Sequence, residues 1–327
     1  MVVYSDSIEY AEQVIPHPTS HWTAARSRVS AELQRLSVNL YGDKPLHEST
    51  VPSDLLWDYL FVVESAPRSH YDLLVELSRE ATPLPDGVLC LAGAGQQFHG
   101  FKNRPWAASP GNIHLSAHLA PSRPISHAGV AFTILAAVSV IDVLDSTPGL
   151  QNRAGIKWVN DVLIDGAKVC GVLAYTQTMD ETVNAAVIGI GLNVETTPAV
   201  EPTPSVPRVG SLRDFAPDLK TCNQRVAFDK LIQALDHNYR LLVDGRYEVL
   251  LERYRRRSLV IGRHVAICSE TSGGDPEVIA KGRVTALGDD LELYLEGFEK
   301  PFSHGRLLLE PEPRANPDPQ VRTQQVR

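Results

Sequence analysis

The sequence predicts an α+β protein with one large domain of mixed helices and strands and one small β domain. Between about residue 51 and residue 257, apolar runs typical of buried strands alternate with runs of helical periodicity. After about Leu259 the pattern changes to short strand-like runs separated by Gly and Asp-Asp turns, which is typical of a small barrel. A length of 327 residues is enough for this two-part organisation.

The first 50 residues give the weakest signal. Trp22, Val29, Leu33 and Leu36 recur at roughly helical spacing, which predicts one amphipathic helix. No residue pattern in this segment points to chemistry. Residues 1–50 are therefore expected to be an N-terminal extension of unknown role.

Local signals predict the main elements of the large domain. Ser69 is followed three residues later by Asp72, which is the pattern of a capping box at a helix start. The run GNIHLSAHL alternates apolar residues and predicts a half-buried strand. The run AFTILAAVSVIDVLD is apolar almost all round and predicts a core helix. Asp165-Gly166, between two apolar runs, predicts a tight hairpin.

The C-terminal part is predicted as two pieces. Residues 258–312 contain the runs LVIGRHVAIC, EVIAKGRVTAL, LELYLEG and GRLLLEP, which predict the strands of the small domain. Residues 313–327 are rich in Pro, Gln and Arg and are expected to be disordered.

Composition and charge exclude several classes of protein. With 31 Lys and Arg against 39 Asp and Glu, the net charge of −8 gives no chain-wide field that would attract nucleic acid. The 4 cysteines lie far apart and form no CxxC pair, which favours reduced core thiols over disulfides or zinc ligands. The sequence begins without a signal-peptide pattern and has no apolar run of about 18 residues. A cytoplasmic protein without a membrane partner is expected.

The run GAGQQFHGFKNRPW, residues 93–106, is glycine-rich and basic, so it is a candidate for phosphate contact. A P-loop would have Lys directly after its second glycine, but Phe101 follows Gly100 here. A Rossmann loop would have glycine where Phe98 stands, and it would open a helix rather than a strand. On this run alone, a nucleotide loop and a plain glycine-rich turn both remain open.

Three runs together resemble the biotin protein ligases. GIKWVNDVLIDGAKVCGVLAY is similar to their KWPNDV signature with its turn and following strand, VIGIGLNV to their GxGxN strand, and RPWAASPGNIHLS to the segment that closes their ligand loop. The resemblance covers about residues 60 to 310. It implies a class II synthetase-like mixed sheet flanked by helices, followed by an SH3-like domain.

The resemblance implies a two-step ligation with ATP and biotin as substrates and Mg²⁺ as the metal. ATP activates the carboxylate of biotin as biotinyl-adenylate, and a lysine of a biotin carboxyl carrier protein domain then attacks it. No DNA-binding domain is expected before the ligase region, so neither repression nor a nucleic-acid partner is expected; a homodimer is compatible with the family. Two alternatives stay open: a lipoate or octanoate ligase of the same fold, and a catalytically weak protein that binds an acyl-adenylate or a carrier.

The resemblance assigns the central signature to the nucleotide. Lys157 is expected to be the catalytic cation at the substrate carboxylate and the adenylate phosphate, where positive charge stabilises developing negative charge. Asn160 and Asp161 are expected at ATP, and Asp161 and Asn193 are expected to be oxygen ligands of Mg²⁺. Gly171 is expected to let a ligand or another backbone approach closely. The alternatives from the residues alone are a lysine snorkelling at a strand end and polar caps of turns and strand ends.

Three further residues are expected to contact the substrates. By resemblance, Gln96 contacts the neutral ureido group of biotin and Ser65 lines the biotin pocket. Ala66 and Pro67 stand where the family has Thr-Asn. Trp106 is expected to pack over the adenylate, because an aromatic ring suits an adenine face.

The glycine-rich loop departs from the family pattern. The family reads approximately Gly-Arg-Gly-Arg-x-Gly-Arg, and this chain has FHGFKNR. His99 and Phe101 replace arginines on either side of Gly100, and these three residues are expected at the substrates. Lys102 and Arg104 are the cations expected to remain at the phosphate. Because Lys and His cannot reproduce bidentate guanidinium contacts, we hypothesise that the loop retains the adenylate less tightly.

Two other groups are assigned no site. His114 and His118 lie four residues apart on a predicted strand without a third ligand, which indicates surface or core histidines rather than a metal site. The basic run from Arg253 to Ser258 lies at a predicted helix end, where cations suit the helix dipole, and is not expected to bind nucleic acid.

Overall fold

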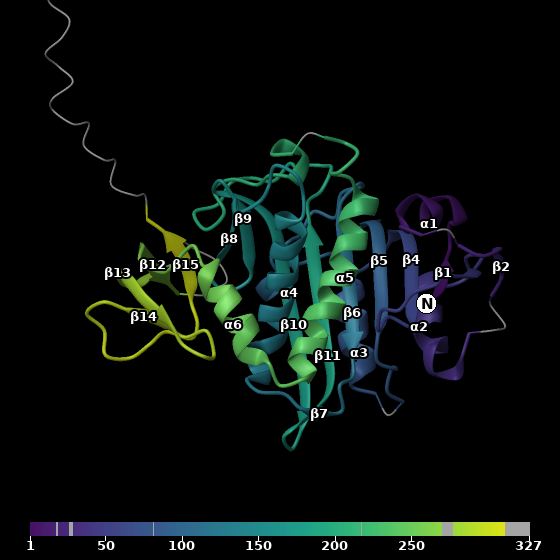
Figure 1. Cartoon of the computed structure of the whole chain (residues 1–327), viewed down its shortest axis with the longest axis horizontal. Coiled ribbons are helices and arrows are strands. Elements are labelled where there is room, and N and C mark those ends of the chain that lie inside the picture. The colour runs from purple at the N-terminus through teal and green to yellow at the C-terminus, as the bar shows by residue number, and fades with distance from the viewer. Residues whose placement is uncertain (18, 26–28, 81, 217, 270–276, 311–327) are drawn as a thin grey trace, which may run out of the picture.

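The computed structural model of the chain describes residues 1–17, 19–25, 29–80, 82–216, 218–269 and 277–310. A large sheet with helices packed against it is followed by a small sheet at the C-terminal end (Figure 1). This arrangement confirms the predicted α+β fold, in which a mixed sheet flanked by helices precedes a small β domain. The expected disordered tail, residues 313–327, lies outside the described residues.

The described helices and strands have the following bounds. The helices are α1 (Ile8–Val14), α2 (Ala31–Tyr41), α3 (His70–Ser78), α4 (Ala128–Asp145), α5 (Gln224–Val243) and α6 (Tyr247–Arg256). The large sheet contains β1 (Val2–Ser5), β2 (Thr23–Ala24), β3 (His47–Thr50), β4 (Tyr59–Ala66), β5 (Val88–Gly95), β6 (Ile113–Leu119), β7 (Arg123–Pro124), β8 (Ala154–Lys157), β9 (Asp161–Ile164), β10 (Ala167–Met179) and β11 (Thr182–Leu192). The small sheet contains β12 (His264–Cys268), β13 (Val278–Leu287), β14 (Leu293–Leu295) and β15 (Arg306–Leu309).

The large sheet is mixed, as expected. Its strands follow the order β2-β3-β1-β4-β5-β6-β11-β10-β9-β8, and β7 pairs with β11 outside this path. Strand β4 is parallel to β1 and to β5, and the other neighbours are antiparallel. Strands β1, β2 and β3 come from residues 1–50, so the N-terminal segment widens the large sheet at one edge.

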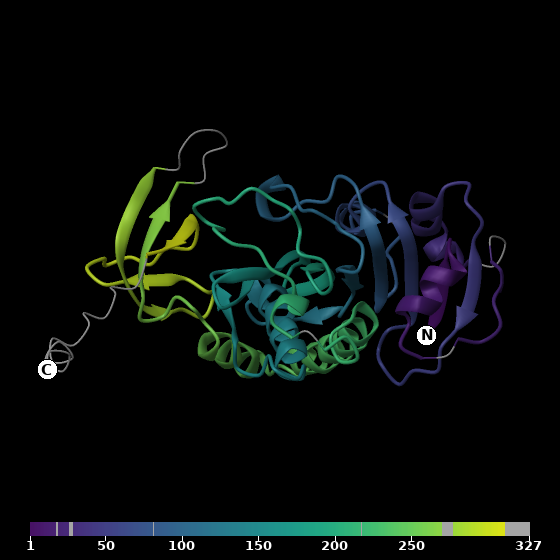
Figure 2. The ribbon, with the colours of Figure 1, turned by 90° about the horizontal axis from the view of Figure 1, so that it is seen from above.

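Helices cover both faces of the large sheet and create two cores. Helices α4, α5 and α6 lie together on one face, while α2 and α3 pack against the other (Figures 1 and 2). Strand β4 divides its side chains between the cores by alternation, with Leu60 and Val62 in the first and Phe61 and Val63 in the second. Each face therefore needs its own helix layer.

Helix α4 is the core helix that the sequence predicts. It packs between the sheet and helices α5 and α6. In length and composition it could cross a membrane, contrary to the expectation that no apolar run is long enough, and 67% of it is buried inside the protein. Packing on several sides explains why apolar residues surround the whole helix.

Two sequence predictions differ from the structure near these layers. Strand β6 is buried along its whole length rather than half-buried, because helices cover both faces of the sheet at this strand. The N-terminal helix begins only at Ala31, so Leu33 and Leu36 are in it but Trp22 and Val29 precede it. The chain before it forms β2, which pairs with β3, and sheet pairing overrides the helical spacing there.

The predicted hairpin at Asp165-Gly166 is confirmed. These two residues join β9 to β10, with φ angles of 48° and 80°. A two-residue turn with both φ angles positive matches the right-handed twist of the paired strands, and Asp-Gly adopts it at low cost.

The small β domain contacts the large domain at several points. Its antiparallel sheet has the order β14-β13-β12-β15. The indole Nε1 of Trp158 donates to the carbonyl oxygen of Leu291 at 2.7 Å, and the hydroxyl of Tyr247 donates to the carbonyl oxygen of Asp289. Arg255 adds an ion pair to Asp289 at 2.8 Å. The KWVND turn and helix α6 therefore both contact this domain.

The basic run at the end of α6 is largely occupied by ion pairs. Arg253 pairs with Asp142 and Arg257 pairs with Asp145, both on α4. These pairs join the two helices. They give the run a structural role at a helix end.

Candidate active site

A cavity of about 360 Å³ opens on the α3 face of the large sheet. Its wall comes from the loop after β5, from β6, β9, β10 and β11, from the loop that follows β11, and from the start of β15. Most of the predicted site residues lie on this wall: His99, Gly100, Phe101, Arg104, Trp106, Asn160, Asp161, Gly171 and Asn193.

Strand register places the central residues in one row across the sheet. Lys157 pairs with Asp161, and Asp161 pairs with Gly171. Gly171 pairs with Gly191, which in turn pairs with His114. Residues directly opposite one another on neighbouring strands project from the same face. The signature residues therefore lie in a continuous line under the cavity.

This row depends on a bulge in β10. An uninterrupted hairpin from Asp165-Gly166 would place Cys170 opposite Asp161. Val169 is an extra, unpaired residue that shifts the register by one, so Gly171 faces Asp161 instead. The bulge brings a glycine to the cavity and keeps the thiol of Cys170 in the core on the opposite face.

Trp106 lies over the two glycines of the row. A Cβ at Gly191 would be 2.4 Å from the indole ring, and a Cβ at Gly171 would be 3.5 Å from it. The indole Nε1 donates to Nδ1 of His114 at 3.4 Å, and Nε2 of His114 donates to the carbonyl oxygen of Ser109 at 3.1 Å. Burial lowers the pKa of His114 to about 4, consistent with a neutral ring in this tautomer. The glycines thus leave room for a fixed aromatic side chain.

Lys157 is a buried cation beside the cavity. The residue is 5% exposed, and its Nζ donates to the carbonyl oxygen of Ser205, which lines the cavity. Burial lowers the pKa of Lys157 to about 8, although the carboxylate of Asp161 opposes that shift; nearby cations lower it further. The amine of Lys157 is therefore still mostly protonated at neutral pH, but it is poorly hydrated.

Two cations at the site were missed by the sequence analysis. Lys168 Nζ lies 2.6 Å from Oδ1 of Asp161 and 5.6 Å from the centre of the Trp106 ring. Arg306, the first residue of β15, brings a guanidinium group from the small domain to the cavity wall. Lys168 could have been found, because it follows the hairpin turn on the strand that carries Gly171. No local pattern connects Arg306 to strands so far upstream.

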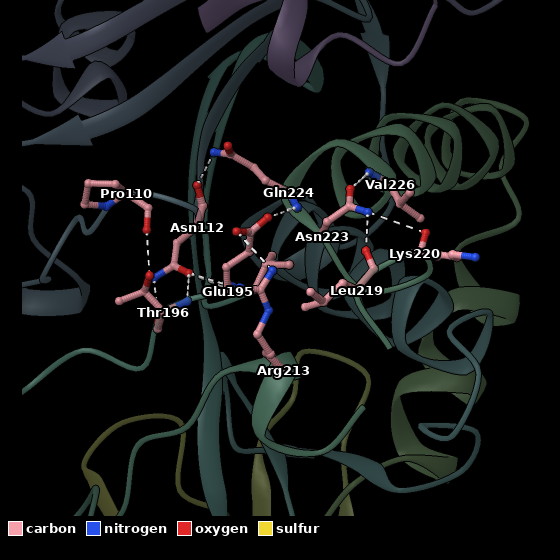
Figure 3. A network of polar contacts seen from close by, with 11 residues as sticks. Pro110, Asn112, Glu195, Thr196, Arg213, Leu219, Lys220, Asn223, Gln224 and Val226 are labelled. Atoms are coloured by element: carbon pink, nitrogen blue, oxygen red, sulfur yellow. Dashed lines mark hydrogen bonds and ion pairs between the residues drawn. The ribbon is translucent and has the colours of Figure 1, made fainter. Parts of the chain in front are cut away.

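Asn112 fixes the turn that follows β11 (Figure 3). Its Oδ1 accepts hydrogen bonds from the backbone N–H groups of residues 194–196 at 2.9, 3.1 and 3.0 Å. The carboxylate of Glu195 accepts a hydrogen bond of 2.8 Å from the N–H of Gln224 at the start of α5. These bonds hold the backbone directly after Asn193 and so help to orient its side chain.

Asn193 is held by the backbone and keeps one oxygen free. Its N–H donates to the carbonyl oxygen of Val169 at 2.8 Å, and its Nδ2 donates to the carbonyl oxygen of Gly210 at 3.0 Å. The residue is 1% exposed, and its Oδ1 accepts no hydrogen bond from any part of the chain that the structure describes. A buried unpaired amide oxygen on a cavity wall fits a cation or a donor group of a ligand.

This donor set fits a magnesium ion that arrives with a nucleotide. Mg²⁺ in proteins is usually held by one or two carboxylates together with substrate phosphates and water. Asp161 would supply a carboxylate and Asn193 the unpaired amide oxygen, both on the cavity wall. Within the described ranges no three His, Cys, Asp or Glu side chains form a metal cluster, so phosphate and water oxygens would complete the shell.

The loop from Phe98 to Trp106 closes on itself at the cavity mouth. The N–H of Trp106 donates to the carbonyl oxygen of Phe98 at 2.9 Å, and the N–H of Gly100 donates to that of Arg104 at 2.7 Å. Lys102 stands at the exposed tip with a positive φ of 56°. Arg104 Nε donates to the carbonyl oxygen of Phe101 at 3.0 Å, which draws that cation back toward the loop.

His99 joins this loop to helix α3. Its Nε2 lies 2.7 Å from Oδ2 of Asp72, and its Nδ1 lies 3.0 Å from the carbonyl oxygen of Gly100. Burial lowers the pKa of His99, but the bonds to Gly100 and Asp72 outweigh burial and raise it above its ordinary value. Two acceptors around one ring favour the imidazolium form. The predicted capping box is wrong, because Ser69 makes no side-chain hydrogen bond at the helix start and Asp72 binds His99.

The structure does not bring every predicted residue to the cavity. Ser65, near the end of β4, and Gln96, directly after β5, are exposed, and neither lies on the cavity wall. Lys102 is also off the wall, and so is Lys157, which reaches the wall only through its bond to Ser205. Asn160 lies on it, and its Nδ2 donates to the carbonyl oxygen of Val172 at 2.8 Å, which fixes the turn before β9.

The remaining histidine prediction agrees with the structure. His118 is 1% exposed and its Nδ1 bonds to the carbonyl oxygen of Pro85 at 3.0 Å. His114 is also buried, bonded to Trp106 and Ser109, but it lies on the cavity wall.

Comparisons with known proteins agree with this architecture. Residues 83–193 match the model of the biotin/lipoate A/B protein ligase family. The biotin–[acetyl-CoA-carboxylase] ligase of Mycobacterium tuberculosis is 30% identical over 247 residues, which cover 72% of this chain and 85% of that protein. The bifunctional ligase/repressor BirA of Bacillus subtilis is 33% identical over 135 residues, but the match spans only 41% of its length.

A solved structure has the same fold. The biotin protein ligase of Aquifex aeolicus in complex with biotin and ATP superposes with a TM-score of 0.58 at 17% identity, over 78% of this chain and 99% of that one. At this identity the likeness concerns the fold. The Mycobacterium tuberculosis protein is similar to this chain in sequence as well, over most of its length. This chain belongs to the biotin/lipoate A/B protein ligase family.

Proposed function

We propose that this chain is an ATP-dependent biotin–[carboxyl carrier protein] ligase. The observation that carries the proposal is the row of Lys157, Asp161, Gly171 and Gly191 across the sheet beneath a single cavity. The names of the relatives in Mycobacterium tuberculosis and Aquifex aeolicus support biotin as the acyl group and ATP as the activating substrate.

In the first step, a carboxylate oxygen of biotin attacks the α-phosphorus of ATP and pyrophosphate leaves. Negative charge builds up on the phosphoryl oxygens, and cations fixed beforehand around the cavity stabilise it. Lys157 is the buried cation, and Arg104, Lys168 and Arg306 lie on the cavity wall. Because the burial of Lys157 removes competing water, its charge acts more strongly there than at the surface.

In the second step, the amine of a carrier lysine attacks the acyl carbon and AMP leaves. Binding in the cavity would shield the mixed anhydride from part of the bulk water until the carrier arrives. Trp106, fixed on Gly191 and Gly171, offers an aromatic face to the adenylate. The carrier is a biotin carboxyl carrier protein domain, which is the partner that the names of the relatives suggest.

Magnesium, the cellular location and the oligomeric state belong to the same proposal. Asp161 and Asn193 would hold Mg²⁺, and that ion would bind and orient the phosphates. The free, buried cysteines of the described chain suit a reducing compartment such as the cytoplasm. A homodimer remains compatible with the family resemblance.

A second candidate is a lipoate or octanoate ligase. It is favoured by the placement of Ser65 and Gln96, the two expected biotin contacts, outside the cavity wall. It is also favoured by the apolar side chains of Phe98 and Leu173 and the aromatic ring of Tyr71 on that wall.

Mass spectrometry of a purified carrier domain tests the proposal. The protein is incubated with ATP, Mg²⁺, biotin and the carrier, and a carrier with its target lysine changed to arginine is the control. The proposal predicts that one biotinyl group is added to the carrier with its native lysine and none to the arginine control. Modification by lipoate or octanoate but not by biotin would support the second candidate. If no acid is transferred to the carrier, the remaining interpretation is a protein that binds adenylate or carrier without catalysis.

A further inference from the structure

The cavity has an unusual neighbour in His70, the first residue of α3. His70 is 2% exposed, and neither ring nitrogen has a hydrogen-bond partner in the described part of the chain. Burial, with smaller contributions from His114 and Arg68, lowers the pKa of His70 to about 3, so the ring is neutral. A buried polar ring without partners costs free energy, and such groups usually have a ligand or a solvent partner in the working state.

Phe98 stands between this histidine and the cavity in a chain of ring contacts. Its ring centre lies 6.2 Å from that of His70 and 5.8 Å from that of His114. Phe98 lines the cavity, as do Ser69 and Tyr71 on either side of His70, whereas His70 itself does not. His70 is therefore one side chain away from the substrate space.

Phe98 packs over a glycine at the edge of the cavity. Its ring rests directly on the backbone of Gly95, where a Cβ would lie only 2.1 Å from it. The loop that carries it is closed by two backbone hydrogen bonds, from Trp106 to Phe98 and from Gly100 to Arg104. Rotation of the Phe98 side chain would vacate the space over Gly95 that its ring now fills, and a planar ligand ring would fit there.

We propose that Phe98 occupies the head-group subsite of the acyl substrate and that its displacement exposes His70, which then hydrogen-bonds the ureido group. This proposal rests on the proposed ligase function and names a specificity residue within it. The match is chemical: a neutral imidazole has one donor and one acceptor nitrogen, and a ureido group offers N–H donors and a carbonyl acceptor. Ser65 and Gln96, the expected neutral contacts, lie off the wall, which leaves His70 to supply this recognition.

An octanoyl chain has no polar group to satisfy His70. Since His70 has no partner in the described part of the chain, the ureido group gains a hydrogen bond there that octanoate cannot make. His70 would therefore select biotin over a fatty acid, which is the choice that separates the proposed function from its alternative.

The test is ATP–pyrophosphate exchange with biotin, desthiobiotin or octanoate, for the wild type and for His70→Leu, His70→Gln and Phe98→Ala. Desthiobiotin keeps the ureido group and octanoate lacks it. Loss of one neutral hydrogen bond predicts a KM for biotin and desthiobiotin about 5- to 10-fold higher in His70→Leu, with kcat little changed. The KM for octanoate should stay the same or fall. His70→Gln, which keeps a neutral donor and acceptor, should recover part of the loss.

Two further variants separate recognition from folding. Phe98→Ala removes the side chain that must move, so the KM for biotin should fall. His118→Leu is the matched control, because His118 is an equally buried histidine with a backbone partner and lies off the cavity wall. His70→Leu removes an unpaired buried polar group, so its melting temperature should equal or exceed that of the wild type.

An equal rise in KM for octanoate and biotin, or no change in His70→Leu, would overturn the subsite. Calorimetric titration with biotin keeps the test independent of catalysis. If exchange fails with every acid but biotin binds, the same contrast between His70→Leu and wild type must appear in the binding constant. If biotin does not bind at all, both the subsite and the proposed function are wrong.

Discussion

The two walls of the cavity are built in different ways. On the sheet wall, Asp161 and Gly171 occupy fixed positions in one row of strand pairing, and the row continues to Lys157 beside the cavity. On the loop wall, the chain from Phe98 to Trp106 is held by its own turn, and Phe101 is 45% exposed. The sheet wall keeps the signature of the family, while the loop wall departs from it.

This difference suggests a division of labour. Strand pairing and packing fix where these residues lie, so the sheet wall suits groups whose positions the chemistry requires. Loop residues can change with little cost to the fold, so the loop wall suits groups that tune affinity and retention. We therefore expect substitutions on the sheet wall to have the larger effects on rate.

Loss of the buried cation should have the largest effect. Lys157→Met should lower ATP–pyrophosphate exchange with biotin by about 10²- to 10³-fold, the cost of removing one fixed group that stabilises charge. Lys230→Met is the control, since Lys230 also donates to a backbone carbonyl, that of Ser146, but lies away from the cavity. Equal loss in both variants would mean that Lys157 acts only through folding.

The same lysine predicts a pH profile. Deprotonation removes its positive charge, so kcat/KM for biotin should fall as pH rises through about 8, the lowered pKa of Lys157. A bound anion favours the charged form, so kcat should fall only at higher pH. A kcat/KM that stays flat to pH 10 would contradict a catalytic role for the Lys157 cation.

Displacing the Trp106 ring with a methyl group on Gly191 should have the next largest effect. Gly191→Ala puts a methyl group 2.4 Å from the indole ring, so the ring or the strand must move. We expect a loss of about 1–3 kcal/mol in the free energy of unfolding, as for other overpacked sites, together with weaker ATP binding. Gly129→Ala, with no atom within 4 Å of the new methyl, is the control. An unchanged ATP affinity in Gly191→Ala would contradict a contact between Trp106 and the nucleotide.

Restoring a loop arginine should have a smaller effect. Phe101→Arg adds a guanidinium group to the cavity mouth, so release of biotinyl-adenylate should slow by about 10-fold, the gain of one charge-assisted contact. Phe101→Leu removes the aromatic ring without adding charge and should leave release unchanged. Faster or equal release in the arginine variant would contradict a loop that retains the intermediate through cations.

Breaking the ion pair between His99 and Asp72 should have the smallest effect. Asp72→Asn should cost about 0.5 kcal/mol of stability at pH 6, because Asp72 is partly exposed and such pairs are weak. The pKa of His99 is raised above 6.5 in the folded state, so this contribution is full below 6.5 and disappears as pH rises through the raised value. Urea unfolding at pH 6 and pH 9 measures it. A difference that grows toward pH 9 would contradict the pairing.

Most of the large-domain elements could be predicted because they depend on local signals. The Asp165-Gly166 hairpin and the apolar α4 follow from turn chemistry and periodicity, and both are confirmed. The N-terminal helix was predicted too early because strand pairing of Thr23–Ala24 overrides its spacing. Long-range pairing of this kind leaves no pattern within a short window of sequence.

The site could be predicted only in part for the same reason. The signature predicted Lys157, Asp161 and Asn193, but the bulge at Val169 that places Gly171 opposite Asp161 has no sequence signal. Arg306 arrives from another sheet. His70 gave no signal either, because its lack of partners is a property of packing.

The most direct test of the account is ATP–pyrophosphate exchange by the purified protein with biotin, lipoate and octanoate in parallel. The account predicts exchange that depends on biotin and is lost in Lys157→Met. That result would mean that the buried lysine and the remaining cations of the cavity suffice without the arginines of the family loop. Exchange with octanoate or lipoate but not with biotin, or biotin-dependent exchange that survives Lys157→Met, would contradict it.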